Sequence, residues 1–165
     1  MIRGIAGASI LAAAALCVGC TSTAGPTITS TTPSTPVARA ASFGTPVSVR
    51  DGSAQYTVTV TTPARATKLS VIANPASGAT VYAIQVTETE TVGTHDVNPL
   101  DFTARDAAGD TYNAALADVD SQLAASQLVA GQTIRGAIAF EVPAGQTIDT
   151  VIAGGTLGEQ AATWR

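Results

Sequence analysis

One cysteine stands where a lipid could be attached. Cys20 follows Gly19 at the end of an apolar run, Gly4–Val18, which has no charged residue and is preceded by one base, Arg3. Small residues before a cysteine let a peptidase reach the backbone, and the thiol of the new N-terminus can carry a diacylglycerol by thioether. Such a charged start and short apolar core are typical of a secretory leader. The pattern predicts a bacterial lipoprotein signal, residues 1–19, and a lipid anchor at Cys20 on the extracytoplasmic face of the cell membrane.

Two alternatives to this lipoprotein signal stay open. An uncleaved membrane anchor needs about 20 strongly apolar residues, and this run is shorter and rich in Ala and Gly. Three positions before the cysteine, where Leu is usual, the chain has Cys17, so ordinary signal cleavage nearby would instead yield a secreted protein. A redox or zinc pair is disfavoured because both cysteines lie in or beside the leader and no second pair follows.

Catalysis would have to involve the chain's one histidine, His95, which stands beside Asp96. A hydrolase triad needs a serine next to such a pair, and no Gly-x-Ser-x-Gly motif occurs. The sequence therefore favours a solvated histidine in a loop, and we expect that the protein is not an enzyme.

A second pair of candidate residues consists of Glu88 and Glu90, which lie two apart at the end of a predicted strand. Acids at such positions are typically solvated and discourage edge pairing.

Four aspartates form the candidate metal site: Asp106, Asp110, Asp118 and Asp120. Calcium takes several oxygen ligands from loops of this kind. The spacing matches no EF-hand, however, and aspartates are common in turns because their side chains bond nearby backbone N–H groups. Zinc is disfavoured because it prefers His and Cys ligands. We expect no cofactor, with calcium as the alternative.

Composition limits the partners. The net charge is −4, only 12% of residues are charged, and 4% are aromatic. A nucleic-acid surface needs clustered positive charge, so a nucleic-acid partner is not expected. The bases beyond the leader are scattered: Arg39, Arg50, Arg65, Lys68, Arg105, Arg135 and Arg165. The abundance of Thr and Val suits β-strands.

Residues 20–41 are rich in Ser, Thr and Pro and offer nothing that could fill a core. Extended at about 3.1 Å per residue, such a segment could reach roughly 65 Å, so we interpret it as a tether. It could be an O-glycosylated stalk or an unmodified linker. The remaining segment, 42–165, is long enough for one domain with its own core.

Alternation of apolar and polar residues predicts strands in this domain. The expected strands are Gln55–Thr61, Thr80–Thr89, Leu100–Arg105, one beginning at Thr111, Thr133–Val142 and one beginning at Thr147. Asp106–Asp110 reads as a hairpin turn in which Gly109 takes a positive φ. Ala114–Leu128 suits either a short helix or an irregular loop. The pattern predicts an all-β fold, an immunoglobulin-like antiparallel β-sandwich.

Two segments carry a family resemblance. Asn98–Tyr112 contains Phe-x-x-x-Asp-x-x-Gly-x-x-Tyr, and Gly131–Pro143 contains Gly-x-x-x-x-Gly-x-x-x-Phe-x-Val-Pro. With Trp164 near the end, they resemble the telokin-like domain of unknown function of bacterial lipoproteins, and are similar to the immunoprotective extracellular antigen family of mycobacteria. The resemblance implies an immunoglobulin-like fold and an exported envelope protein without established enzymatic activity. It transfers no functional residues.

The sequence is compatible with two main functions. In the first, the domain is an interaction module that meets a protein or envelope partner, while the N-terminal lipid meets the membrane. In the second, it carries a small apolar or lipid ligand between its sheets. The few aromatic side chains stand at positions that an ordinary core needs, whereas a carrier cavity requires a large apolar lining, so the interaction role is favoured. Hydrolase activity is a distant third.

Overall fold

The computed structural model describes residues 40–67, 76–115, 119–154 and 160–165. All of them belong to one compact unit, Pro36–Arg165. The strands in chain order are β1 (Val47–Asp51), β2 (Ala54–Val60), β3 (Ala64–Arg65), β4 (Thr80–Val92), β5 (Thr94–Val97), β6 (Phe102–Arg105), β7 (Thr111–Ala115), β8 (Ser126–Val129), β9 (Thr133–Val142), β10 (Thr150–Gly154) and β11 (Gln160–Trp164). One 3₁₀ turn, η1 (Pro99–Asp101), precedes β6.

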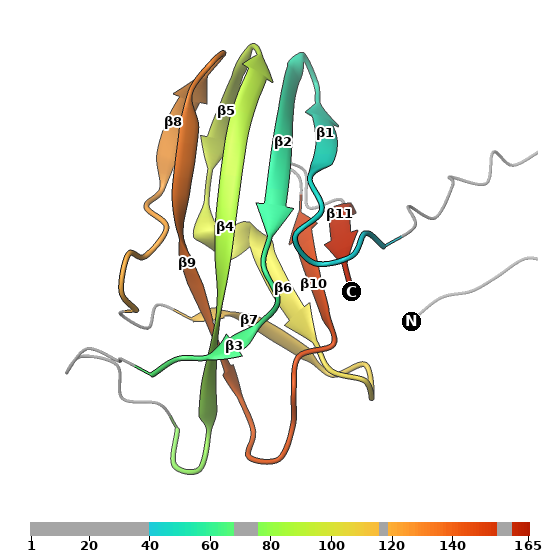
Figure 1. Ribbon diagram of the computed structural model, residues 1–165, viewed down its shortest axis with the longest axis vertical. Coiled ribbons are helices and arrows are strands. Elements are labelled where there is room, and N and C mark those ends of the chain that lie inside the picture. The colour runs from blue at the N-terminus through green and yellow to red at the C-terminus, as the bar shows by residue number, and fades with distance from the viewer. Residues whose placement is uncertain (1–39, 68–75, 116–118, 155–159) are drawn as a thin grey trace, which may run out of the picture. The chain divides into compact units, whose positions relative to one another are not determined.

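The strands form two layers that share one strand. The order is β1-β2-β4-β9-β7-β6-β10-β11, with β3 beside β4, and every pairing between these strands is antiparallel. β7 changes partner along its length: Thr111–Asn113 pairs with β6, and Ala114–Ala115 pairs with β9. In Figure 1, β2, β4 and β9 stand in front of β6 and β10. The expected immunoglobulin-like β-sandwich is confirmed.

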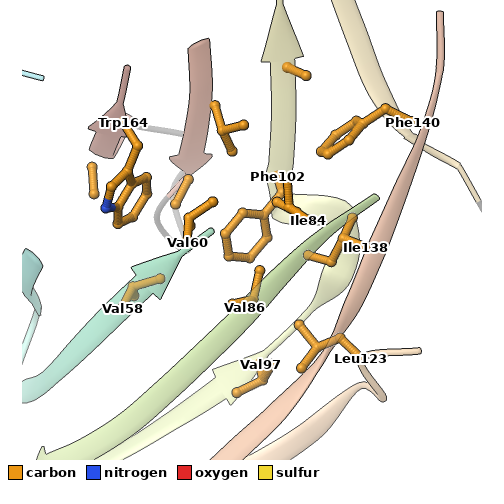
Figure 2. Close-up of a cluster of buried hydrophobic side chains, with 14 of the residues drawn as sticks. Val58, Val60, Ile84, Val86, Val97, Phe102, Leu123, Ile138, Phe140 and Trp164 are labelled. Atoms are coloured by element: carbon orange, nitrogen blue, oxygen red, sulfur yellow. The ribbon is translucent and has the colours of Figure 1, made fainter. Parts of the chain in front are cut away.

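Alternate side chains of the long strands meet between the layers. Tyr56, Val58 and Val60 point inward from β2, and Ile84 and Val86 do so from β4. Figure 2 shows these aliphatic side chains packed around Phe102, with Phe140 and Trp164 on either side. The other layer contributes Phe102, Ala104, Val151, Ala153, Ala162 and Trp164. This face-to-face packing explains the period of two in the sequence.

A separate two-stranded ribbon covers one end of the inner face. β5 pairs with β8 in antiparallel register from Thr94↔Val129 to Val97↔Ser126, and neither strand joins the larger sheet. The ribbon packs against β2 and β4, and Figure 1 shows β5 behind β4. We call β5 and β8 the ribbon. Its inward residues include Val97 and Leu128, which belong to the main core.

The structure corrects one prediction and decides between two alternatives that the sequence left open. Leu100 was expected in a strand, but it lies in η1 and is 54% exposed, because Pro99 and the Asn98 side chain, which accepts from the Leu100 N–H, favour a turn. For Ala114–Leu128 the sequence allowed a short helix or an irregular loop. The loop alternative holds for 119–125, which contain no helix or strand. Ala114–Ala115 end β7, Ser126–Leu128 begin β8, and residues 116–118 lie outside the described residues.

Candidate functional site

His95 is not the solvated loop residue that the sequence indicated. It lies in β5, and its side chain is 11% exposed. The imidazole stacks on the ring of Tyr56, with centroids 3.7 Å apart and planes 16° from parallel. Its Nε2 lies 3.1 Å from Oε2 of Glu88. The turn at Gly93 reverses the chain after β4, so β5 returns along the inner face and brings His95 back to Glu88.

The expectation of solvated acids at the end of β4 is also wrong. Glu88 is 2% exposed and Glu90 is 0% exposed. The inward alternation of Ile84 and Val86 continues in phase through both acids, and the ribbon covers this end of the sheet. Both carboxylate oxygens of Glu90 lack a hydrogen-bond partner in the described structure. Burying a polar group without a hydrogen bond is costly, so the side chain of Glu90 lowers the stability of this region.

A small polar cavity adjoins the histidine. Its polar lining comes from Tyr56, Glu88, His95, Asn98 and Asp101, and its volume is about 10 Å³. The Asn98 side-chain amide donates to Asp101 Oδ1 at 3.1 Å. A cavity of this size has room for about one water molecule. It is therefore too small for an organic substrate or a lipid.

The electrostatics of this cluster are dominated by acids. Burial first, and then the charge of Glu88, raise the pKa of Tyr56. Burial and Glu88 likewise raise the pKa of Asp101. Burial alone would lower the pKa of His95, but the Glu88 hydrogen bond and the charges of Glu88, Glu90 and Asp51 outweigh it, so the pKa is raised.

This arrangement can hold and release a proton at His95. The described contacts of the imidazole are with Tyr56 and Glu88, and neither supplies the serine nucleophile that a triad requires. We name His95, Tyr56, Glu88 and Glu90 the histidine cluster. One feature of the sequence pointed to this cluster. Glu88 and Glu90 fall at the same alternate positions of their strand as the buried residues Ile84 and Val86.

Asp106, one of the four calcium candidates, organises a turn. It is buried, and its Oδ1 accepts from the backbone N–H groups of Ala108 and Asp110 at 3.0 and 2.9 Å. Its Oδ2 accepts from the Tyr112 hydroxyl at 2.7 Å. The Tyr112 bond is the main reason that the pKa of Asp106 is lowered, and it raises the pKa of Tyr112 to about 12. These bonds account for the Asp-x-x-Gly-x-x-Tyr spacing, with Gly109 at φ +95°.

The other three calcium candidates do not share the buried position of Asp106. Asp110 and Asp120 are exposed, and Asp118 lies outside the described residues. Among the residues that the structure describes, no three His, Cys, Asp or Glu side chains are grouped to hold a metal ion. The expectation of no metal site, with calcium at these aspartates as the alternative, stays a prediction. Cys20 and the tether likewise lie outside the described residues, and no helix within the described ranges is long and apolar enough to cross a membrane.

Three turns meet at one end of the sandwich and form a surface that we call the hairpin end. They are the β1–β2 turn at 52–53, the β4–β5 turn at Gly93, and the β8–β9 turn at 130–132, all at the top of Figure 1. The Ala130 N–H donates to the Gly93 carbonyl at 3.1 Å, and the Gly131 N–H donates to the Glu90 carbonyl at 2.8 Å. These bonds link the β4–β5 turn to the β8–β9 turn. The side chains of Val92 and Val129, which lie next to these turns, are exposed.

A shallow groove lies elsewhere on the surface. It is formed by the Ala76–Ala79 turn and the Glu141–Ala144 segment, and its volume is about 450 Å³. Figure 1 places the β9–β10 turn at the opposite end from the hairpin end. The groove is lined mostly by small side chains, so it offers little chemistry beyond contact area.

Known structures share this fold. The secreted protein MPT63 of Mycobacterium tuberculosis is 19% identical, with a TM-score of 0.61 over 76% of this chain and 95% of MPT63. YcdA of Bacillus subtilis, described as a candidate lipoprotein, is 16% identical, with a TM-score of 0.52 over 73% of this chain and 37% of YcdA. YjhA of Bacillus subtilis is 15% identical, with a TM-score of 0.53 over 72% of this chain and 85% of YjhA. The expected similarity to a secreted mycobacterial protein is confirmed for the fold.

The family assignment rests on a sequence model. No curated protein matches the chain significantly. Residues 44–162 match the model of a domain of unknown function, DUF4352, and these residues span nearly the whole sandwich. The chain belongs to the DUF4352 family.

Proposed function

We propose that this protein is an envelope lipoprotein, anchored through Cys20, that displays its β-sandwich as a non-enzymatic interaction module. The leader and the Ser/Thr/Pro-rich segment before the sandwich support the anchor and the tether. The proteins of similar fold include a secreted one and one described as a candidate lipoprotein, which agrees with an extracytoplasmic location. The telokin-like character suggested by the sequence belongs to the same proposal.

The packing between the layers, in the part of the chain that the structure describes, supports the interaction role. Side chains of both layers pack against one another between the sheets, and the hollow beside His95 measures only about 10 Å³. Small-molecule sites usually need about 300–1,000 Å³. This favours a partner that meets the outer surface over a ligand carried between the sheets.

We place the contact surface at the hairpin end. Val92 and Val129 are half exposed there, and the backbone bonds around Gly93 and Ala130 hold their turns together. A rigid surface loses little conformational freedom on binding, which favours affinity. The partner is a protein or another envelope component that can cover two aliphatic side chains.

Site-specific cross-linking in the producing cell tests this surface. A photoreactive phenylalanine analogue at Val92 or Val129 is expected to give a discrete cross-linked product on illumination. The matched control is the same analogue at Ala144, an exposed position in the β9–β10 turn, where we expect no such product. Discrete adducts at Ala144 alone, or equal labelling at all three positions, would refute the hairpin end as the contact surface.

A further inference from the structure

The ribbon is held in place by side-chain packing against the larger sheet and not by strand pairing with it. β5 and β8 pair only with each other, and an isolated two-stranded ribbon is marginally stable in water. At one end it is joined to the larger sheet through the turns at Gly93 and 130–132. Along its length it is held by inward side chains, of which Val97 and Leu128 are apolar and His95 is titratable.

We propose that the histidine cluster is a proton-dependent latch that fastens the ribbon to the inner face of the sheet. The imidazole of β5 contacts two strands of that sheet at once, stacking on Tyr56 of β2 and bonding Glu88 of β4. This inference concerns the fold itself and does not rest on the proposed function.

The charged and titratable groups around His95 favour its protonated form. They are Asp51 from β1, Tyr56 from β2, Glu88 and Glu90 from β4, and Asp101 from η1. The β8 residue paired with His95 is Leu128, which adds no charge. The cluster therefore combines several carboxylates with one imidazole, and a proton on that imidazole supplies the only positive charge among the groups just named.

Protonation strengthens the latch. A protonated imidazole donates from both ring nitrogens, so the 3.1 Å contact with Glu88 becomes a charge-assisted hydrogen bond. The acids around the ring, Glu88, Glu90 and Asp51, also favour the positive charge on His95. When His95 loses this proton, the ring is neutral and the charge-assisted bond to Glu88 is lost. The ribbon is then held less firmly to the sheet.

The sign of the pH dependence follows from the raised pKa of His95. A group whose pKa is higher in the folded state contributes stability that is fully present below its unfolded value. For His95 that value is about 6.5, and the contribution is lost as the pH rises through the folded pKa. The latch is therefore closed in mildly acidic surroundings and loosens as the pH increases.

Two measurements on the mature chain carrying Cys20→Ala test the latch together. Because the chain has a single histidine, proton NMR reports the His95 titration without ambiguity, and we expect a pKa above 6.5. Amide exchange, corrected for its intrinsic pH dependence, reports ribbon opening. Opening of Thr94–Val97 and Ser126–Val129 relative to β9 should increase about tenfold for each unit by which the pKa is raised.

Variants separate the latch from general loosening. Glu88→Gln should lower the His95 pKa and remove the pH dependence of ribbon opening. The control Asp96→Asn alters the next residue, an exposed acid that bonds Gln127, and should preserve both. Should His95 titrate at or below its ordinary value, or should the ribbon and β9 open together at every pH, the latch is disproved. The wild-type titration decides the matter even where a variant fails to fold.

Discussion

Alanine at position 136 is expected to destabilise the domain by about 3 kcal/mol, the upper end of what overpacking a core usually costs. Gly136 lies in β9 and faces Leu123, whose segment pairs with β9 beside it: the Leu123 N–H donates to the Ala137 carbonyl at 2.8 Å. A Cβ at 136 would lie 2.3 Å from the Leu123 Cα and 2.5 Å from its N. These atoms are backbone, so a side-chain rotation cannot relieve the clash. Urea unfolding measures the loss.

Two controls define the cause of this effect. Thr133→Ala changes an exposed residue of the same strand. It removes the hydroxyl contact with Thr89 and should lower the free energy of unfolding by no more than about 1 kcal/mol. Adding Leu123→Ala to Gly136→Ala should not restore stability, because the obstructing atoms remain. A Gly136→Ala variant as stable as Thr133→Ala would show that the 121–123 segment does not pack against β9 as described.

Truncation of Trp164 to alanine is the second large effect, with an expected loss of about 3–5 kcal/mol. The indole is fully buried, and its Nε1–H donates to the Thr45 carbonyl at 2.9 Å. The same part of β11 holds the start of the domain, because the Ala41 N–H donates to the Thr163 carbonyl at 2.8 Å. Losing the indole should therefore loosen the entry of the chain into the sandwich as well as the core. Thermal unfolding and amide exchange at Ala41 measure the two consequences.

Trp164→Phe is the matched variant. It keeps an aromatic ring in the core but loses the bond to Thr45, so a smaller loss of about 1–3 kcal/mol is expected from the carbonyl left without its partner. Equal stability of the Phe and Ala variants would argue against the packing role assigned to the indole.

The long strands could be predicted from the sequence because apolar side chains recur at every second residue along them. β2, β4 and β9 span 7, 13 and 10 residues, and their alternation is visible without any tertiary information. β5 and β8 are only 4 residues each, too short for a period of two to stand out. Their strand character comes from pairing between positions at least 29 apart in the sequence, which no local pattern reveals.

The histidine cluster could be predicted only in part. Glu88 and Glu90 alternate in phase with Ile84 and Val86, but local propensity treats an acid near a strand end as solvated. Their burial depends on the ribbon folding back at Gly93. That reversal also brings His95 to Tyr56, which is 39 positions earlier in the chain. The Asp106 turn was easier to predict, because all its partners lie within six residues.

The most direct test of the account is the intact mass of the native protein from the producing cell, compared with a Cys20→Ala variant. The proposed anchor predicts a mature chain that begins at Cys20, carries a diacylglycerol, and is found in the membrane fraction. The variant should lack the lipid and leave that fraction. An unlipidated native chain, cleaved elsewhere and recovered from the medium, would contradict a membrane-anchored module.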